Sequence, residues 1–500
     1  MQKAAAVALF LCAGGVRAEE PAAAAAELER LLGQFVEVFA AAEKHAAEPV
    51  NSYRAVYGGA IPGMLKRLDP HSIFFDPDQF EQLRQLQTAT QKGFGSVVSI
   101  LPGRVFVLQT LAGTPSANAG MQPGDEILAI NNIALDRLSV EQLVGLLSES
   151  RRREVNLFIR RPGAARLIEI TMKPESMASE SVDLALLLEP GIGYVRVKSF
   201  EGDTGRRVRE AIEKLGGAKL QALALDLRDN HGGVMGAALE TAALFLPSDQ
   251  VIVSVRGRGR RTEEIKVPGT SKPYAFRLAV LVGPETASGA EIVAGAVQDL
   301  HRGVVVGLPT FGKGLVQQVY DLSDNTGLAL TTAYYYTPSG RSIQRPIAGG
   351  QLDPSESRGG GVQPEHIQFP EPMNRLRMVL EGSGAFPTFA TLFLRKSLPV
   401  EASFEVSDSM LDDFQSWLSE RGIQPSVGEW STDREWTRGR LKQEIFNQAF
   451  GVARGDEVEL RRDAVVRAAV ALLKRPGEST VRRRAVAAPG LNDSSAPEQP

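Results

Sequence analysis

Residues 222–233 read ALALDLRDNHGG, and this stretch indicates the fold class. Residues 222–227 have the length and apolar composition of a buried strand, and the adjacent Gly232 and Gly233 permit a tight turn with exposed N–H groups. Outward from this stretch, apolar strands are predicted at 193–197, 278–282 and 304–306, and helices at 206–215, 237–245 and 288–300. Apolar strands that alternate with helices predict an α/β layer arrangement.

A serine and a lysine lie at the ends of predicted elements in this region. Ser288 lies between small residues where a helix begins, a position that by itself is typical of an N-cap serine. Lys313 lies between glycines among apolar strands, a setting that lowers the pKa of its amine. A neutral lysine amine can accept the proton of a serine hydroxyl. If residues 313–317 are extended, Gln317 shares a face with Lys313 and can orient the amine. Because Gly314 follows the lysine, the motif is not a P-loop.

Several motifs in the same order resemble the carboxyl-terminal processing proteases, also called tail-specific proteases. This is a family of secreted serine peptidases that use a Ser–Lys pair and carry an inserted PDZ domain. The resemblance runs from about residue 68 to residue 370. Its motifs are LDPHS (68–72), GFGS (93–96), AGMQPGDEILAINN (119–132), LDLRDNHGG (225–233), ASGAEIVAGAVQD (287–299), GLPTFGKGLVQQ (307–318) and YYTPSGRSIQ (335–344). The spacing matches the family, so the resemblance implies Ser288 as nucleophile, Lys313 as general base and Gln317 as the residue that orients Lys313.

The family chemistry also needs donors for the oxyanion. Backbone N–H groups of Gly232 or Gly233, together with that of Gly289, are expected to form this oxyanion hole. The mechanism requires no metal ion and no organic cofactor.

The chain departs from the family pattern around these residues. Thr286 and Ala290 stand where the family usually has further serines, and neither change removes the nucleophile. His231 stands where the family commonly has proline before the paired glycines. This histidine opens an alternative in which it is the base for the serine, but that alternative leaves the lysine and the glutamine without a role.

Residues 91–175 are predicted to form the PDZ domain. In such domains a peptide tail adds as a strand to a sheet edge, and backbone N–H groups bind its carboxylate. The turn at residues 122–125 favours this interpretation. The carboxylate-binding loop is predicted at Gly93, Phe94, Gly95 and Ser96, and the pocket for the terminal side chain at Phe94, Val97, Val98 and Leu143.

The resemblance implies a multi-domain α/β protein with a crotonase-like peptidase core, an inserted β-rich PDZ-like domain and helical segments at both ends. The predicted divisions are a signal peptide (1–18), an N-terminal helical segment (19–90), the PDZ domain (91–175), the Ser–Lys peptidase core (176–370), a C-terminal helical region (371–480) with Trp417, Trp430 and Trp436 as packing anchors, and a disordered tail (481–500).

The N-terminus predicts export, with the periplasm as the destination. Lys3 precedes a short apolar run at residues 4–13, and small residues allow cleavage after Ala18. A lipoprotein anchor at Cys12 is disfavoured because the bulky Leu11 precedes it. No later segment has 18 consecutive apolar residues, so no membrane span is expected in the mature chain.

The composition argues against nucleic acid as a partner. Lys plus Arg number 56 and Asp plus Glu number 59, so the net charge of −3 lacks the basic excess that phosphate contacts need. A single cysteine in 500 residues excludes an intrachain disulfide and a cysteine-based metal cluster.

The predicted function is that of an exported endopeptidase that binds apolar C-termini of proteins or peptides through its PDZ domain. A catalytically silent PDZ scaffold that binds protein tails is the alternative, and the three filled catalytic positions argue against it. The apolar stripes of residues 25–68 and 375–475 either close the core or form a homodimer contact. The resemblance also leaves room for an adaptor protein.

Overall fold

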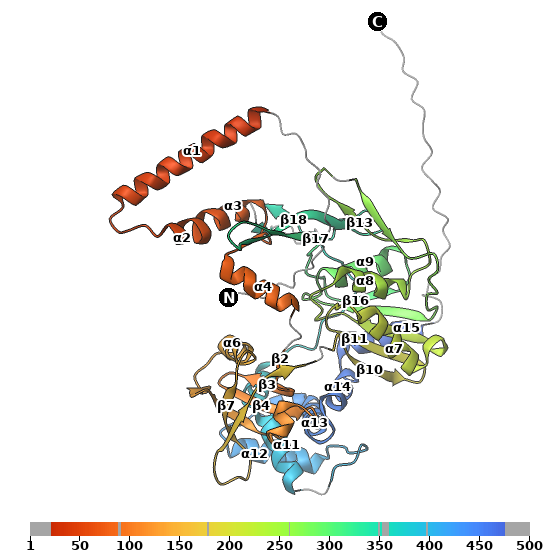
Figure 1. Ribbon diagram of the computed structural model, residues 1–500. Coiled ribbons are helices and arrows are strands. Elements are labelled where there is room, and N and C mark those ends of the chain that lie inside the picture. Colours follow the sequence, from red (N-terminus) through yellow and green to blue (C-terminus); the bar gives the residue numbers. More distant parts are fainter. Residues whose placement is uncertain are drawn as a thin grey trace.

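The computed structural model describes residues 22–88, 92–177, 180–259, 261–348, 351–352, 360–396 and 399–475 (Figure 1). The predicted signal peptide and the predicted C-terminal tail therefore lie outside the described residues. Among the helices that are described, none is both long enough and apolar enough to cross a membrane.

A six-stranded sheet forms the centre of the predicted peptidase core. The strand order is β10 (Val182–Glu189), β11 (Ile192–Val197), β12 (Ala222–Asp226), β15 (Arg277–Val282), β16 (Val304–Gly307) and β21 (His366–Ile367). The strands from β11 to β21 run parallel, and β10 is antiparallel at one edge. The α/β arrangement predicted from the alternating pattern is confirmed.

Helices cover both faces of this sheet. One face packs on α7 (Thr204–Leu215), α8 (Met235–Ala243) and α9 (Gly289–Asp299), and the other packs on α15 (Ala464–Lys474). Side chains of a strand alternate between the two faces. In β12 the leucines face α7, α8 and α9, whereas the alanines face α15 and let this helix approach closely. The C-terminal helix is thus a layer of the peptidase core.

A second sheet lies beside the first and joins distant parts of the chain. Its strands are β1 (Ile73–Phe75), β13 (Val251–Arg256), β14 (Glu263–Lys266), β17 (Leu315–Asp321) and β18 (Gly327–Tyr336). The long β18 pairs with β17 along one edge, and with β1 and β13 along the other. This pairing places the N-terminal β1 and the strand that follows Lys313, β17, on opposite edges of β18.

The predicted PDZ domain is a sheet accompanied by helices. Its sheet contains β3 (Ser96–Leu101), β4 (Arg104–Thr110), β5 (Glu126–Ile130), β6 (Ile133–Ala134), β7 (Val155–Arg160) and β8 (Ile168–Met172). The helices are the short α5 (Pro115–Asn118) and the longer α6 (Val140–Ser150). The chain enters and leaves the domain through a two-stranded ribbon of β2 (Lys92–Gly93) and β9 (Glu175–Ser176).

Helices precede and follow these domains. The N-terminal ones are α1 (Ala22–His45), α2 (Ser52–Ala55), a π-helical turn (Val56–Ala60), α3 (Ile61–Leu68) and α4 (Pro77–Thr88). Figure 1 shows α1 extending away from the other elements. Most of its large apolar side chains are exposed, so this helix does not close the core of the chain.

The C-terminal helices form their own apolar core and contact the PDZ domain. They are α10 (Arg375–Gly382), α11 (Ala385–Lys396), α12 (Asp408–Ser419), α13 (Val427–Phe450) and α14 (Val452–Leu460). The three tryptophans pack in this core with phenylalanines, which confirms their predicted role as anchors. The Arg104 guanidinium of the PDZ domain donates to the Ser383 carbonyl over 2.6 Å, and the Val452 N–H donates to Gln109 Oε1 over 2.8 Å.

Candidate active site

Ser288 lies at a sharp turn between β15 and α9. It is 4% exposed, and its backbone has φ 55° and ψ −119°. A positive φ is unfavourable for a residue with a Cβ and persists only where the surrounding structure enforces it. Here the Ser288 N–H donates to Glu291 Oε2 over 2.9 Å, and residues 286, 287, 289 and 290 around the serine are buried. The strained turn presents the serine at the carboxyl end of the parallel sheet, where α/β proteins bind ligands.

The predicted oxyanion glycines lie directly beside this serine. A Cβ added to Gly232 would lie 2.7 Å from Ser288 Cβ and 3.1 Å from the Gly289 nitrogen, so only glycine fits there. The Gly232 N–H donates to Asn230 Oδ1 over 2.8 Å. Among the described residues, the N–H groups of Gly233 and Gly289 have no such acceptor. The geometry therefore favours Gly233 and Gly289 as oxyanion donors, with Gly232 providing the space.

Two buried polar side chains hold the glycine loop against the serine turn. Asn230 is fully buried, and its Nδ2 donates to the Val197 carbonyl over 2.9 Å. The backbone carbonyl of Asn230 accepts from the Ala287 N–H over 2.9 Å. Thr286 Oγ1 donates to the Leu227 carbonyl over 2.6 Å. The threonine that replaces a family serine thus has a structural role across the two loops.

Lys313 and Gln317 are both buried, at 7% and 4% exposure. Lys313 precedes β17, and a bulge between Val316 and Gln317 interrupts the pairing of that strand with β18. Burial lowers the pKa of the lysine amine, while the nearby carboxylate of Glu291 partly opposes this shift. Gln317 Nε2 donates to the His71 carbonyl over 2.7 Å, so its Oε1 is the amide atom left to accept from an amine.

Glu291 connects the serine turn with the lysine loop, and the sequence analysis did not identify it. Its Oε2 accepts from the N–H groups of Ser288, over 2.9 Å, and Lys313, over 2.8 Å. Its Oε1 accepts from Thr310 Oγ1, over 2.5 Å, and from the Gly312 N–H, over 2.7 Å. Burial raises the pKa of this carboxyl to about 6, although all four hydrogen bonds favour the ionised form. One side chain therefore fixes the spacing between the serine and the lysine.

The only sequence signal for Glu291 was its position three residues after Ser288. Ser-x-x-Glu at a helix start is typical of a capping box, in which the glutamate accepts from the N-cap N–H. The structure contains that hydrogen bond, but the glutamate also binds two further backbone donors from residues 312 and 313.

The chain matches two family models, Peptidase family S41 at residues 191–354 and PDZ domain at residues 106–161. It is 33% identical over 309 residues to the carboxyl-terminal-processing protease of Synechocystis, covering 61% of this chain and 72% of that protein. It is 35% identical to the chloroplastic carboxyl-terminal-processing peptidase 2 of Arabidopsis thaliana, covering 60% of each. The chain belongs to the carboxyl-terminal-processing protease family. A solved photosystem II D1 C-terminal processing protease is 28% identical, with a TM-score of 0.42 over 66% of this chain and 86% of that one.

This membership confirms the predicted enzyme class. The protein is a serine peptidase with a PDZ domain. These matches favour the peptidase over the alternative of a catalytically silent PDZ scaffold. Proteins or peptides are its substrate class.

In this carboxyl-terminal-processing protease the LDPHS motif forms a tight turn beside the lysine. Asp69 Oδ1 accepts from the N–H groups of His71 and Ser72, over 2.7 and 2.8 Å. The turn directs the His71 carbonyl to Gln317 and buries the imidazole, whose Nε2 has no hydrogen-bond partner among the described residues. Burial, together with the positive charge of Lys313, lowers the pKa of His71. The neutral imidazole adds no charge that would compete with the lysine.

His231 does not share this environment. Its imidazole is largely exposed, and Nδ1 lies 3.6 Å from Glu285 Oε2, which is exposed as well. The Ser–His alternative therefore receives no support from the geometry.

The PDZ domain of this protease contains an apolar cavity of about 530 Å³ beside the predicted loop. Gly93, Phe94, Gly95, Ser96 and Val98 line it as expected, but Val97 and Leu143 do not. Leu143 is fully buried in the core of the domain, and the next residue of α6, Val144, faces the cavity with Leu147. Successive residues of a helix point in directions that differ by about 100°. A prediction that is wrong by one position therefore selects a side chain of the domain core instead of one that lines the cavity.

Proposed function

We propose that Ser288 is the nucleophile, Lys313 the general base and Gln317 the residue that orients the lysine. The observation that carries the proposal is that Glu291 Oε2 accepts from the backbone of both the serine and the lysine. This shared acceptor supports a fixed relation between a strained, buried serine and a buried lysine whose pKa is lowered. Both features are needed for a Ser–Lys mechanism at neutral pH.

In the proposed reaction, Ser288 Oγ attacks the scissile carbonyl carbon and its proton passes to Lys313 Nζ. The resulting oxyanion receives hydrogen bonds from the N–H groups of Gly233 and Gly289. The lysine then gives its proton to the leaving amine as the C–N bond breaks, which leaves an acyl-enzyme. The same amine then takes a proton from the water that attacks the ester and returns it to Ser288 Oγ as the bond between that oxygen and the acyl carbon breaks, which releases the acid product and restores the enzyme.

The PDZ cavity is proposed to select the substrate. A C-terminal tail would add as a strand beside β3, with its carboxylate at the N–H groups of residues 93–96 and its last side chain in the cavity. The lining supports apolar ends, because Ile100, Leu111 and Met121 add to the residues named above. We therefore propose that proteins or peptides with apolar C-termini are the preferred substrates.

Export to the periplasm, a homodimer and an adaptor protein complete the proposal. Export rests on the signal-peptide pattern at residues 1–18. The homodimer is supported by the exposed apolar side chains of α1, among them Leu28, Leu31, Leu32 and Phe35. The adaptor rests on the family resemblance alone.

Tail selection can be tested with a Val144→Asp variant. The variant is expected to raise KM at least about tenfold for an unfolded reporter with an apolar C-terminus, because the new carboxylate makes the cavity unfavourable for apolar groups. The kcat should change little, since the PDZ cavity holds none of the proposed catalytic residues. KM and kcat are measured from the cleavage of two unfolded reporters, one with an apolar tail and one with an acidic tail.

The matched control for this experiment is Val140→Asp. Val140 lies on the same helix and is exposed, but it does not line the cavity. Equal KM values for the wild type and Val144→Asp on the apolar tail would contradict tail selection. That result would leave the catalytic proposal unaffected if cleavage still depends on Ser288.

The ionisation of Glu291 is expected to limit activity in acid. Below a pH of about 6, its protonated carboxyl would present a hydroxyl where Ser288 or Lys313 presents an N–H, so kcat/KM should fall as the pH drops through 6. Because the pKa is raised above the ordinary value of 4.5, this group adds stability as the pH falls from 6 toward 4.5. Activity should therefore fall without unfolding.

Glu291→Gln separates this effect from the titration of Lys313. The amide cannot accept all four hydrogen bonds, and kcat/KM at pH 8 should drop about 10- to 100-fold. The remaining activity should lose the acid limb near pH 6 in a pH–rate profile, with folding followed by circular dichroism. An unchanged acid limb in this variant would assign the limb to another group.

A further inference from the structure

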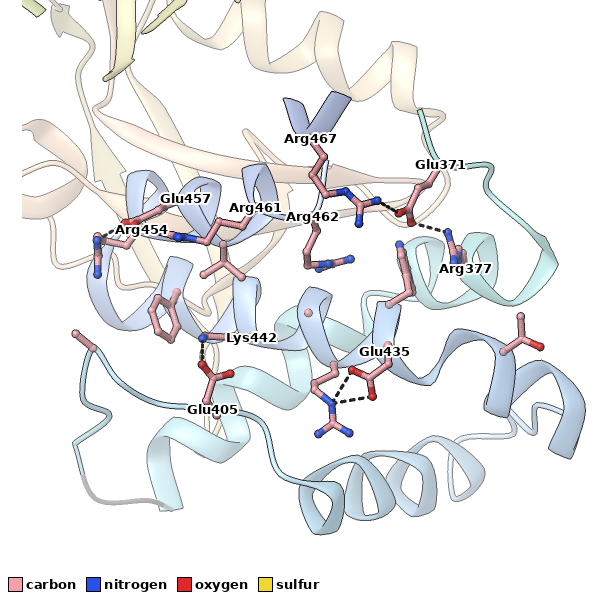
Figure 2. Close-up of a pocket in the computed structure, with 17 residues that line it drawn as sticks. Glu371, Arg377, Glu405, Glu435, Lys442, Arg454, Glu457, Arg461, Arg462 and Arg467 are labelled. Atoms are coloured by element: carbon pink, nitrogen blue, oxygen red, sulfur yellow. Dashed lines mark hydrogen bonds and ion pairs between the residues drawn. The ribbon is translucent and has the colours of Figure 1, made fainter. Parts of the chain in front are cut away.

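The C-terminal helices enclose a pocket that the peptidase mechanism does not use. It measures about 850 Å³ and lies between α10, α13, α14 and the start of α15. Seven basic and four acidic side chains line it, so positive charge predominates. Figure 2 shows these side chains reaching into one space from helices on several sides. Trp436 and Phe446 add an apolar part to the wall.

The acidic side chains of the pocket are paired with its basic side chains, Glu405 with Lys442 and the other three with arginines. Glu371 accepts from Arg377 over 3.3 Å and from Arg467 over 3.1 Å, and the dashed lines in Figure 2 mark both pairs. Glu457 pairs with Arg461 over 2.9 Å and also with Arg454.

Among the basic side chains that line the pocket, Arg462 is the exception. It has no ion pair with a described residue, and its Nη1 is buried without a hydrogen-bond partner. Figure 2 shows its guanidinium between the pairs formed by Glu371 and those formed by Glu457. Burial lowers the pKa of this arginine, and the charges of Arg440 and Arg377 add to that shift, whereas the carboxylates of Glu371 and Glu459 oppose it without forming an ion pair with the guanidinium. An unpaired, partly buried guanidinium costs free energy unless an anion compensates it.

Helix α13 has a specific place for this guanidinium. A Cβ on Gly439 would lie 2.4 Å from both Nε and Nη1 of Arg462, so a larger residue there would displace the guanidinium from its present position. Glycine within a helix is about 1 kcal/mol less favourable than alanine. Helix α13 thus contains an unfavourable glycine, and an arginine without an ion pair lies beside it. A contact that served only to stabilise the fold would need neither feature.

We propose that this pocket binds a small organic anion through an oxyanion group, phosphate or carboxylate, held by Arg462. Arginine is suited to this role because its planar guanidinium donates two parallel hydrogen bonds to such groups. The excess of basic side chains selects for negative charge, and the volume accommodates a ligand larger than inorganic phosphate. Trp436 and Phe446 offer contacts for its apolar part.

Binding can be measured by calorimetry on the full chain with three probes, inorganic phosphate, pyrophosphate and citrate, at constant ionic strength. Citrate carries carboxylates and the other two carry phosphate oxygens, so the order of affinity identifies the preferred group. Wild-type protein should bind at least one probe saturably. Arg462→Gln should weaken that binding at least tenfold, whereas Arg434→Gln, on the outer part of α13 and paired with Asp412 over 3.0 Å, should not.

Thermal unfolding supplies a second measurement. The melting temperature of the wild type and of Arg434→Gln should rise with the bound probe and reach a plateau. Arg462→Gln should melt at or above the wild-type temperature without ligand, since it removes an unpaired charge, and should show only the small non-saturating rise that any such salt produces. Gly439→Ala should favour the helix yet weaken binding, because the methyl group displaces the guanidinium.

Two results would overturn the proposal. One is the absence of saturable binding by all three probes. The other is equal binding by the wild type, Arg462→Gln and Gly439→Ala, which would identify an adventitious ion only. Neither result depends on peptidase activity, so the catalytic proposal stands or falls separately.

Discussion

Replacing Ser288 by alanine is expected to lower kcat/KM by about 10⁴- to 10⁶-fold, the range found when a serine nucleophile is removed. The substitution removes only Oγ. Alanine keeps the Cβ, and the N–H that donates to Glu291 belongs to the backbone. The strained turn should therefore persist, and the melting temperature should stay close to that of the wild type. Cleavage of an unfolded reporter with an apolar tail, followed by gel and by fluorescence, measures the loss.

A matched control comes from the same turn. Thr286→Ser keeps the hydroxyl that bridges the Leu227 carbonyl and the Gly283 N–H, and it places the residue that the family usually has there. This control should retain most of the activity. If Ser288→Ala cleaved the reporter at the wild-type rate, the nucleophile would be a different residue. If it lost cleavage while still binding the tail, the PDZ domain and the peptidase site would be separable.

The core strands could be predicted from the sequence because their signals are local. An apolar run of strand length, followed by paired glycines, is informative without knowledge of its partners, and β12 forms where the pattern indicated it. The positions of Ser288 and Lys313 were predicted from motif spacing. What local pattern could not give is the shared acceptor, Glu291, that links the two segments. The hydrogen bonds of Glu291 come from segments about twenty positions apart, and the capping pattern accounts for only one of them.

Amphipathic patterns in the sequence left a different question open. They indicate that a helix has an apolar face but not what that face covers. The apolar stripe of α15 was grouped with the C-terminal helices, whereas it packs on the peptidase sheet. On α6, both Leu143 and Val144 fit an apolar pattern, and only the packed domain decides which one lies in the core. Residues 25–68 also read as helical, but a π-helical turn and a break after His45 interrupt them.

An ion pair connects α15 with the loop beside the candidate active site. Asp463, at the start of α15, accepts from Arg228 over 2.6 Å. Arg228 also binds Asp226 at the end of β12, directly before the glycine loop. The C-terminal layer thus supports the strand end from which the proposed oxyanion donors extend. The sequence offered no signal for this pairing, because the two partners are more than 200 positions apart.

Replacing Lys313 by methionine is expected to lower kcat/KM by about 10³- to 10⁴-fold, at the upper part of the range for a general base. Methionine has a similar length and fills the buried space without a titratable amine. Because burial lowers the pKa of the lysine, the folded state gives up the proton more readily than the unfolded chain. The lysine therefore opposes folding at neutral pH, and its stability contribution improves only as the pH rises toward 10.5. The methionine variant should unfold at or above the wild-type temperature.

Lys313→Arg then distinguishes a base from a fixed positive charge. The guanidinium keeps the charge but does not deprotonate in proteins, so it cannot accept the serine proton. If the lysine acts as a base, both variants are inactive, and wild-type kcat/KM rises with pH through the lowered pKa of the amine. If the residue acts only as a charge, the arginine variant retains activity and the methionine variant does not. An active methionine variant would contradict both roles and would return attention to other bases near Ser288, among which the buried imidazole of His71 would be the first to test.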